Sequence, residues 1–528
     1  MKEHTFHLDT SSSPAKFGYS ETFNVVVPFI DRHLTEDRGG KIAILCSNGE
    51  SVRYSELADR INRCGNLLLG KGMKAGERLL MVVKDAPEFF YLFWGSIKAG
   101  IIPVPLNTLL RSQDFAFLIE DSECSGLVYS EEFSVEVEGA LNSVQLKPDL
   151  VLKSESANKG LQQLLMDASP DLEPAPTQSD SDCFWLYSSG TTGRPKGAIH
   201  LHRDMMVTSQ YYGVETLGIS EADVCYSAAK LFFAYGLGNA MTFPLWTGGT
   251  CVLDAGRPTP DSTFANIERF QPSLYFGVPT LYAALLNSKI SHSLFKSLRL
   301  SVSAGEALPA NLYEKWYKFL GIKVLDGIGS TEMLHIFISN TIDNISPGAS
   351  GKPVPGYEAR LINDDGSIAS DNQIAELEIK GPSSAVSYWN KPEKSKVTFK
   401  AEWTRTGDKY IRDTKGIYTY CGRADDMMKV SGQYVSPFEV EAALQTHDEV
   451  LEAAVVAKKD KDNLIKPKAF IILKNQCNDE EILKTKLTNH VKKQLTPFKY
   501  PRWYEFVEVL PKTATGKIQR YKLRTNDD

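Results

Sequence analysis

Residues 188–197, SSGTTGRPKG, are the most informative stretch of the chain, and they directly follow the apolar run CFWLY at 183–187. Small residues let backbone N–H groups approach phosphate oxygens, hydroxyl groups add donors, and Lys196 adds positive charge. A surface turn can share this composition, but ten consecutive residues of these types after a strand-like run favour a phosphate-binding loop. The Walker pattern is excluded because the lysine follows Pro195 and no Ser or Thr follows it.

The segments around this loop alternate between helical and strand-like patterns. An apolar stripe from Tyr54 predicts a helix that stops near Gly70 and Gly72, and the runs ERLLMVV, PEFFYLFWGSIKAG and IIPVPLN follow it as strand, helix and strand. Such alternation builds a mostly parallel sheet covered by helices. Three later apolar runs, SLYFGVP, SLRLSVSAG and IKVLDGIGS, have the form of buried strands that open into ligand-binding loops. The sequence predicts an α/β fold with a large, multi-lobed N-terminal domain.

The last hundred or so residues follow a different pattern. Ser436, Pro437 and Glu439 predict a helix start with a capping box. The runs AAVVA and AFIILK, a Lys-rich amphipathic helix and WYEFVEVL then predict a compact α+β domain. We expect an N-terminal domain over 1–423, a hinge at 424–426 and a C-terminal domain over 427–528.

Composition and charge exclude several classes of protein. The net charge is −6, with 59 basic against 65 acidic residues, so no overall charge attracts nucleic acid or an anionic membrane. No signal-like or membrane-spanning apolar run occurs, and we expect a cytoplasmic protein. The eight cysteines form no C-x-x-C pair, so we expect reduced and mostly buried thiols.

Further motifs accompany the loop in a fixed order, and together with it they resemble the adenylate-forming superfamily of acyl-CoA synthetases, peptide-synthetase adenylation domains and luciferases. They are SAGE at 303–306, DGIGSTE at 326–332, TGD at 406–408, a stretch from Gly422-Arg423 to Gly432, and TGK at 515–517. The resemblance spans nearly the whole chain and implies the adenylate-forming enzyme fold. The segments KLFFAYGLGNAMTFPL and GIGSTEMLHIF are similar to the benzoate-CoA ligase branch.

The resemblance implies a two-step reaction that uses ATP and coenzyme A. A carboxylate is a poor electrophile, so it first attacks the α-phosphate of ATP and displaces pyrophosphate, and the acyl group then passes to the thiol. The main catalytic demand is positive charge placed beforehand beside the α-phosphate. Lys517 resembles the lysine that bridges the acyl carboxylate and this phosphate, and Glu332 with the Thr192 hydroxyl is expected to hold Mg²⁺.

The nucleotide site implied by the resemblance draws on all of these motifs. Asp408 is expected to accept hydrogen bonds from both ribose hydroxyls, and Arg423 to contact the ribose or a phosphate. For each of the two, a turn-forming or surface role is the alternative. The remaining expected residues are Ser188, Ser189, Gly190, Thr191, Thr192, Gly193, Lys196, Ala304, Gly305, Glu306, Asp326, Gly327, Ile328, Gly329, Ser330, Thr331 and Lys517.

The resemblance also implies an acyl pocket, which combines small residues with aromatic and aliphatic walls and so suits a flat benzene ring better than a fatty chain. Its residues are Ala234, Tyr235, Gly327, Gly329, His335 and Ile336. For His335, a buried and hydrogen-bonded core position is the alternative to a pocket role. Many superfamily members have an aromatic residue for adenine stacking where this chain has Ile328, and the benzoate-like branch shares this isoleucine.

In the resembling family the small domain rotates between the two half-reactions. Asp425 matches the hinge position, with a polar linker residue as the alternative. After rotation, Lys429, Ser431 and Gly432 are expected to face the active site, where Gly432 leaves room for the pantetheine arm of coenzyme A. The segment around Lys517 also resembles a site modified by protein acetyltransferases. A homodimer is a further expectation.

Two other functions compete with a coenzyme A ligase. An adenylating enzyme could load an aryl acid onto a separate carrier protein. A non-catalytic nucleotide-binding protein could share the same fold, since a fold alone does not prove activity. The presence of Thr192, Glu332, Asp408 and Lys517 argues against this second alternative.

Overall fold

The computed structural model describes residues 2–154, 160–188, 194–288, 292–430, 433–461, 464–475, 479–512 and 518–525. Two compact units share the chain. The first comprises Met1–Pro347, Gly351–Glu358 and Lys380–Thr404, and the second Gly348–Ser350, Ala359–Ile379 and Arg405–Asp528. The hinge expected at 424–426 is the point about which the C-terminal domain would rotate, and it stays a prediction.

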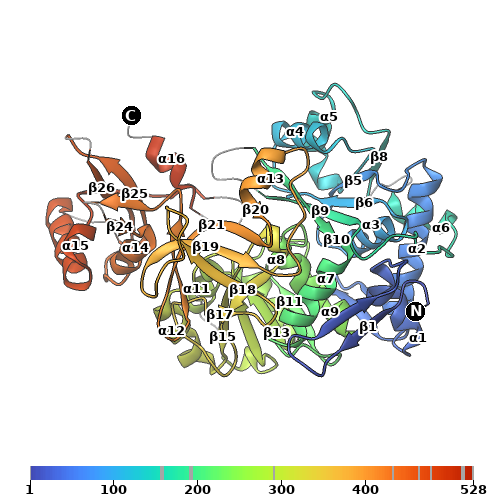
Figure 1. Cartoon of the computed structure of the whole chain (residues 1–528), viewed down its shortest axis with the longest axis horizontal. Coiled ribbons are helices and arrows are strands. Elements are labelled where there is room, and N and C mark those ends of the chain that lie inside the picture. Colours follow the sequence, from blue (N-terminus) through green and yellow to red (C-terminus); the bar gives the residue numbers. More distant parts are fainter. Residues whose placement is uncertain are drawn as a thin grey trace. The chain divides into compact units, whose positions relative to one another are not determined.

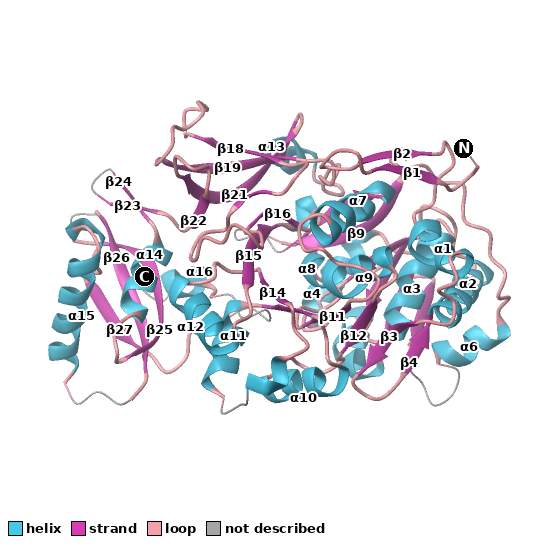
Figure 2. Cartoon of the chain, turned by 90° about the horizontal axis from the view of Figure 1, so that it is seen from below, coloured by secondary structure: helices cyan, strands magenta, loops and turns pink. Residues whose placement is uncertain are grey.

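A nine-stranded sheet crosses the first unit in the order β17-β16-β15-β14-β13-β11-β12-β3-β4. The strands from β15 to β3 are parallel, and antiparallel strands close both ends. Figure 2 shows α10, α11 and α12 on one side of the sheet and α8 and α9 on the other. The strand bounds are β3 Ile42–Cys46, β4 Ser51–Arg53, β11 Val224–Ser227, β12 Thr250–Leu253, β13 Leu274–Gly277, β14 Leu300–Ser303, β15 Val324–Gly329, β16 Ile336–Ser339 and β17 Lys352–Pro353. The helix bounds are α8 Ala234–Leu237, α9 Phe243–Thr247, α10 Pro260–Phe270, α11 Pro279–Asn287 and α12 Ala310–Leu320.

A second sheet in this unit, β6-β5-β7-β8, is parallel throughout. It comprises β5 Arg78–Val82, β6 Ile102–Pro105, β7 Gly126–Tyr129 and β8 Leu150–Lys153, with α4 Ser112–Ser122, α5 Ser134–Leu141 and α6 Leu161–Asp167 nearby in sequence. The predicted helices are α2 (Tyr54–Gly70) and α3 (Pro87–Lys98). These two pack so closely that a Cβ on Gly65 would lie 2.8 Å from the Gly95 carbonyl oxygen. The expected mostly parallel, helix-covered architecture is confirmed.

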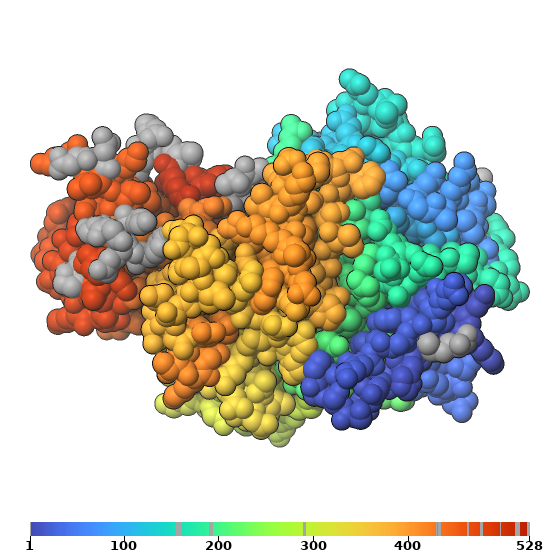
Figure 3. All heavy atoms as spheres, viewed as in Figure 1, coloured from blue at the N-terminus to red at the C-terminus, as the bar shows by residue number. Residues whose placement is uncertain are grey.

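The phosphate-loop motif lies between two antiparallel strands, β9 (Asp182–Ser188) and β10 (Lys196–Leu201), in which Lys196 pairs with Ser188 (Figure 1). The helix α7 (His202–Thr208) follows β10. At the N-terminus, β1 (Phe6–Asp9) and β2 (Lys16–Tyr19) form a hairpin that lies on the surface, dark blue in Figure 3. A short helix α1 (Arg32–Thr35) precedes β3, and α13 (Pro392–Thr398) precedes β20 (Phe399–Lys400).

The second unit contains the predicted α+β domain. Its strands β25 (Val450–Lys459), β26 (Ile465–Leu473) and β27 (Trp503–Phe506) form one sheet, and α14 (Pro437–Gln445), α15 (Glu480–Gln494) and α16 (Arg520–Thr525) accompany it. The Ser436 hydroxyl caps α14 by accepting from the Glu439 N–H at 3.3 Å. The Glu439 carboxylate, expected to complete a capping box, accepts instead from Lys499 Nζ at 2.6 Å. Before this domain lie β18 Glu358–Ile362, β19 Ile374–Lys380, β21 Trp403–Arg412 and β22 Tyr418–Arg423. Within it, β23 Met428–Val430 and β24 Gln433–Val435 form a hairpin.

Two general expectations can be compared with the fold. Within the described ranges, no helix is both long and apolar enough to cross a membrane. The cysteines in those ranges are free thiols, and all but Cys124 are buried. Burial raises the pKa of the Cys421 thiol to about 12, so this thiol is protonated and unreactive. The eighth cysteine, Cys477, lies outside the described residues.

Candidate active site

The predicted site residues fall into one group in each unit, and we describe each group by itself. The first group surrounds Glu332 and the end of β15, and the second surrounds Asp408 and Arg423. Some predicted residues lie outside the described part of the chain: Ser189, Gly190, Thr191, Thr192, Gly193, Ser431, Gly432 and Lys517.

Glu332 is the centre of the first group. It lies on a short helical turn, Thr331–Met333, which Ser330 caps by accepting from the Met333 N–H. Glu332 Oε1 accepts from the Tyr388 hydroxyl at 2.7 Å and from the Ser188 hydroxyl at 3.2 Å. The side chain is therefore half-buried and held on two sides, which is not the state of a solvated surface glutamate.

Neighbouring contacts fix the backbone on which Glu332 lies. His200 on β10 binds the Thr331 carbonyl oxygen through Nε2 at 2.8 Å, and its Nδ1 lies 3.0 Å from Asp204 Oδ2. Both of these side chains are fully buried. Lys196 Nζ lies 4.3 Å from the centre of the Tyr388 ring, a distance typical of a cation–π contact. The phosphate-loop strands and the Glu332 turn thus meet through side chains as well as backbone.

The SAGE motif directly follows β14, where a parallel strand ends at the edge of the sheet. Gly305 has φ +91°, a conformation that favours glycine, so the turn itself explains this residue. Ala304 is buried beside it, and Glu306 is half-buried. The loop is therefore located where α/β sheets commonly bind ligands.

Asp326, another predicted nucleotide contact, lies inside the sheet. It pairs in register with Ser303 and is 5% exposed. Burial raises the pKa of its carboxyl group well above the ordinary value, and Oδ1 has no hydrogen-bond partner among the described residues. Its nucleotide contact stays a prediction. Ile328 and Gly329 continue the same strand, and Ser330 and Thr331 follow it.

The predicted acyl-pocket residues converge at the same end of the sheet. Tyr235, on α8, donates its hydroxyl proton toward the carbonyl oxygens of Val302 (3.1 Å) and Gly277 (3.3 Å), at the ends of β14 and β13. Its ring centre lies 5.7 Å from that of His335. Ala234 precedes Tyr235 at the start of α8.

The two glycines of this group have no room for a side chain. A Cβ on Gly327 would lie 2.9 Å from Ile336 Cγ2, and a Cβ on Gly329 would lie 2.5 Å from the His335 carbonyl oxygen. Strand β16, which begins at Ile336, therefore approaches β15 at a distance that only glycine permits. Any larger residue would displace His335 and Ile336.

His335 is a neutral core histidine that also borders this group. It is 3% exposed, and burial lowers its pKa to about 3. Its Nε2 lies 3.2 Å from Asn239 Oδ1, whereas Nδ1 has no partner among the described residues. His335 is therefore buried, as the core alternative expected. Because it also lies next to Tyr235, its role in the acyl pocket stays a prediction.

In the second group, Asp408 and Arg423 form a cross-strand pair. They are register partners on β21 and β22, and Arg423 Nη1 donates to Asp408 Oδ1 at 3.0 Å and to the Thr406 carbonyl oxygen at 3.0 Å. Gly407 has φ +71°, and a Cβ there would lie 2.8 Å from Arg423 Nη2. The glycine of the TGD motif thus makes space for the arginine of the GR motif.

The expected hinge residue Asp425 lies in the turn after β22, and its side chain is exposed. The adjacent Asp426 instead accepts from Arg524 and lies 3.9 Å from Arg520 Nη1, both on α16. Lys429 lies on β23. Lys512 and Ile518, which flank the segment that contains Lys517, form a β-bridge.

Two residues with a clear structural role, Tyr388 and Asp85, were not identified from the sequence. Tyr388 holds Glu332 but lies 56 residues away, and no spacing rule connects them. Asp85 accepts from the Leu231 N–H at 3.2 Å and lies 3.9 Å from Lys230 Nζ, so it anchors the loop that leads to Tyr235. Burial raises the pKa of Asp85 to about 6. In the sequence, the only sign of this role was that Asp85 is an acidic residue between two apolar runs.

Comparisons with known proteins agree with this geometry. Residues 31–389 match the AMP-binding enzyme family and residues 439–517 its C-terminal domain. The chain is 50% identical to the benzoate–CoA ligase of Thauera aromatica over 98% of both chains. A solved benzoate CoA ligase from Burkholderia xenovorans LB400 is 44% identical with a TM-score of 0.89, over 95% of this chain and 100% of that one. An anthranilate CoA ligase solved with anthranoyl-AMP is 39% identical with a TM-score of 0.91, over 96% and 98%.

The first matched range contains the group around Glu332 and Tyr235, and the second contains α15 and most of α14. Asp408 and Arg423 lie between the two matched ranges. The two family matches together include the glycine-rich motif between β9 and β10, the carboxylate of Glu332 after β15, and most of the α+β domain. This chain belongs to the AMP-binding enzyme family.

Proposed function

We propose that this protein is an aryl-acid CoA ligase that forms AMP. It converts ATP, a benzoate-like carboxylate and coenzyme A into the aryl-CoA thioester, AMP and diphosphate by way of an acyl-adenylate. Relatives named as benzoate–CoA ligases, which align over nearly the whole chain, support this substrate class. The alternative of loading a carrier protein is not favoured by these relatives.

One structural observation carries the proposal. A single strand, β15, packs through Gly327 and Gly329 directly against Ile336 and His335, and it runs into the turn that holds Glu332. A short aryl acid bound beside Tyr235 and His335 would present its carboxylate toward a phosphate held near Glu332. A long aliphatic chain would find aromatic and histidine rings in its way.

The chain's own residues provide oxygen and cationic groups for the nucleotide. Ser188 and Lys196 flank the phosphate loop, and Asp408 with Arg423 is the pair proposed for the ribose. Glu332 fits a Mg²⁺ ligand because its carboxylate lies among hydroxyl groups, and Mg²⁺ commonly uses one or two protein carboxylates together with substrate phosphates and water. Together with the Thr192 hydroxyl it would hold the ion, which when bound would neutralise phosphate charge.

The two half-reactions make different demands on the protein. In the first, a carboxylate oxygen forms a bond to the α-phosphorus and the bond to the pyrophosphate oxygen breaks. In the second, the thiol sulfur attacks the acyl carbon, AMP leaves, and the thiol proton is released. We assign Lys517 to the first step because an amine there would stabilise negative charge on the α-phosphate. Lys429, Ser431 and Gly432 are assigned to the second, with rotation about Asp425.

The Lys517→Ala variant tests this division of roles. Adenylate formation, measured as pyrophosphate release, should fall by at least about a hundredfold, whereas thioester formation from supplied aryl-adenylate should stay within about threefold. Lys512→Ala, at a lysine paired with Glu452 in the same region, is the matched control. Equal loss of both half-reactions would contradict the assignment.

A pyrophosphate-release screen tests the substrate class. Benzoate and its hydroxy and amino derivatives should be the best substrates, cinnamates weaker, and short fatty acids weakest. A preference for aliphatic acids would overturn the acyl-pocket assignment but not the mechanism. Parallel assays with coenzyme A and a phosphopantetheinylated carrier protein identify the acceptor.

Three further expectations remain predictions about the protein in its cell. They are a cytoplasmic location, a homodimer and acetylation of Lys517, which would remove the charge that the first step needs. Mass spectrometry of the protein from its native source tests the acetylation, and light scattering tests the dimer. Lys517 that is never acetylated under any growth condition would eliminate that mode of regulation.

A further inference from the structure

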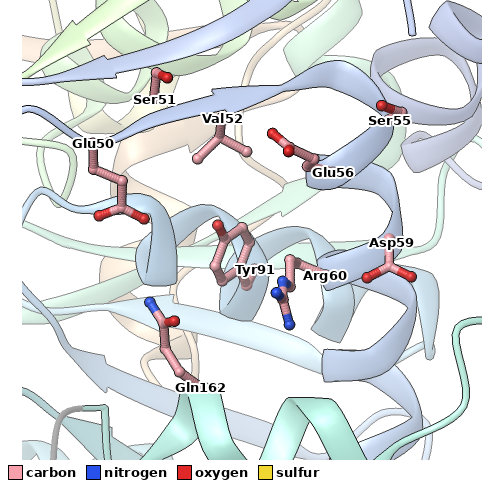
Figure 4. Close-up of a pocket in the computed structure, with 9 residues that line it drawn as sticks. All are labelled: Glu50, Ser51, Val52, Ser55, Glu56, Asp59, Arg60, Tyr91 and Gln162. Carbon is pink, nitrogen blue, oxygen red and sulfur yellow. The ribbon is translucent and has the colours of Figure 1, made fainter. Parts of the chain in front are cut away.

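A cavity of about 370 Å³ lies in the first unit among β4, α2, α3 and α6. None of the residues that line it belongs to the candidate active site. Figure 4 shows Glu50, Tyr91, Arg60 and Gln162 pointing into this space. Its size is that of a small organic molecule, much larger than a single ion.

The cavity has an excess of negative charge. Of its acidic residues, Glu56 is used in capping α2 and Asp59 binds Arg63 at 2.8 Å. Glu50, by contrast, forms no ion pair within the described part of the chain. Burial and the neighbouring Glu88 raise the pKa of Glu50, as expected for two carboxylates that lack a counter-cation.

Glu88, just behind the lining, is 6% exposed, and the partner that it binds is the neutral amide of Gln162, at 2.7 Å. A nearly buried carboxylate with only an amide donor is an unfavourable arrangement unless a cation is close by. Arg60 lines the same cavity, but its Nη1 donates to the weak acceptor Met166 Sδ at 3.0 Å. Arg60 therefore forms no ion pair with the carboxylate of Glu50 or of Glu88 within the described part of the chain.

Tyr91 provides an independent sign of a ligand. It is 4% exposed, yet its hydroxyl makes no hydrogen bond to any described residue, and in Figure 4 this hydroxyl points into the cavity. The oxygen is accessible from the cavity although the ring is buried, so the hydroxyl can donate to or accept from a molecule bound there. The ring also offers an aromatic face to a cation, while Val52 adds an apolar wall.

From these contacts we infer that the cavity is a binding site for a small organic ammonium ion, with Glu50 as the counter-charge and Tyr91 as hydrogen-bond and cation–π partner. A metal ion fits less well, because the described residues contain no group of three or more His, Cys, Asp or Glu side chains placed to hold one. An anion is disfavoured because three of the lining side chains, Glu50, Glu56 and Asp59, are acidic.

Isothermal titration of the full-length protein with putrescine at pH 8 tests the site. We expect saturable binding that Glu50→Gln weakens by at least about tenfold, since a hydrogen bond to a charged group is lost, and that Tyr91→Phe weakens several-fold. Glu314→Gln, at an exposed glutamate on α12, and Tyr317→Phe on the same helix are matched controls that should leave binding unchanged. Circular dichroism melts establish that each variant is folded.

Three results would overturn the inference. They are no heat of binding at millimolar putrescine, equal affinity for wild type and Glu50→Gln, and binding of sulfate in place of the amine. Arg60→Ala provides a further test. If putrescine binds only to this variant, then Arg60 itself is the cation that fills the cavity.

Discussion

In the first unit, Glu332 is held by side chains that lie 144 and 56 residues away, whereas in the second unit Asp408 is held by an arginine only 15 residues further on. The first arrangement brings together the end of β15, Ser188 on the separate antiparallel pair β9–β10, and Tyr388, which forms a β-bridge with Ala198 on β10. The second depends on two antiparallel strands joined by a short connection. Both place a carboxylate beside a hydrogen-bond donor.

The two carboxylates therefore depend on different parts of the fold. Around Glu332, the contacts include the buried His200 and Asp204, so the site and the core share the same residues. Around Asp408, the contacts are local, and the glycine between Thr406 and Asp408 makes the space that Arg423 needs. We expect changes near Glu332 to affect both chemistry and stability, and changes near Asp408 to affect mainly nucleotide binding.

The largest effect is expected for Glu332→Gln. The amide keeps the shape of the side chain but removes the charge proposed for the metal, so pyrophosphate release should fall by a factor of about 10² to 10³. Glu358→Gln, an exposed glutamate in the same unit, is the control. Activity within about threefold of wild type would remove Glu332 from the mechanism.

Asp408→Asn should have the next largest effect. Loss of one charged acceptor from the proposed ribose site should raise the KM for ATP by about ten- to a hundredfold, with little change in the KM for the aryl acid. The melting temperature should change by less than in Glu332 variants if the pair is local. A large loss of stability with an unchanged KM would indicate a purely structural pair.

The pH dependence of stability separates the two units further. Because burial holds the pKa of His335 near 3, below its ordinary 6.5, the unfolded chain takes up a proton that the native state does not. The contribution of the neutral, buried His335 to the free energy of unfolding is therefore largest above pH 6.5 and decreases as the pH falls toward 3. Lowering the pH from 7.5 to 5.0 should therefore reduce the free energy of unfolding by about 2 kcal/mol through this residue.

Denaturant titrations at these two pH values measure the effect. His335→Gln, which removes the titrating group, should lose about 2 kcal/mol less than wild type on acidification. His447→Gln in the second unit is the comparison, because His447 is only half-buried and burial lowers its pKa less completely. Identical pH profiles for wild type and His335→Gln would contradict the assignment of a neutral, buried His335.

Tyr388→Phe should have the smallest effect. It removes the hydroxyl that donates to Glu332 while keeping the ring beside Lys196, so kcat should fall by about tenfold or less. In the Glu332→Gln background the same change should have almost no further effect, because the two side chains act as a unit. Additive losses in this double-mutant cycle would show that Tyr388 acts independently of Glu332.

Much of the fold could be predicted from local patterns. The apolar stripe of α2, the runs that became β5, β13, β14 and β15, and the N-cap of α14 are all set by side-chain periodicity and by capping residues. The family motifs identified Glu332, Asp408 and Tyr235 as candidates. The same motifs also identified Thr192 and Lys517, but these two residues lie outside the described part of the chain, so only their neighbours could be examined.

By itself, the amino-acid sequence determined the alternation of strands and helices and the order of the motifs, whereas the pairing of Arg423 with Asp408 came from the structure. Only the tertiary structure decided that Tyr388 and Ser188 bind Glu332, that Asp85 anchors the loop before Tyr235, and that Glu50 lines a cavity with Glu88 close behind it. The physical reason is that periodicity encodes which face of an element is buried, whereas contacts between distant residues depend on strand order. In the sheet order β13-β11-β12-β3, no spacing in the chain reveals which strands are neighbours.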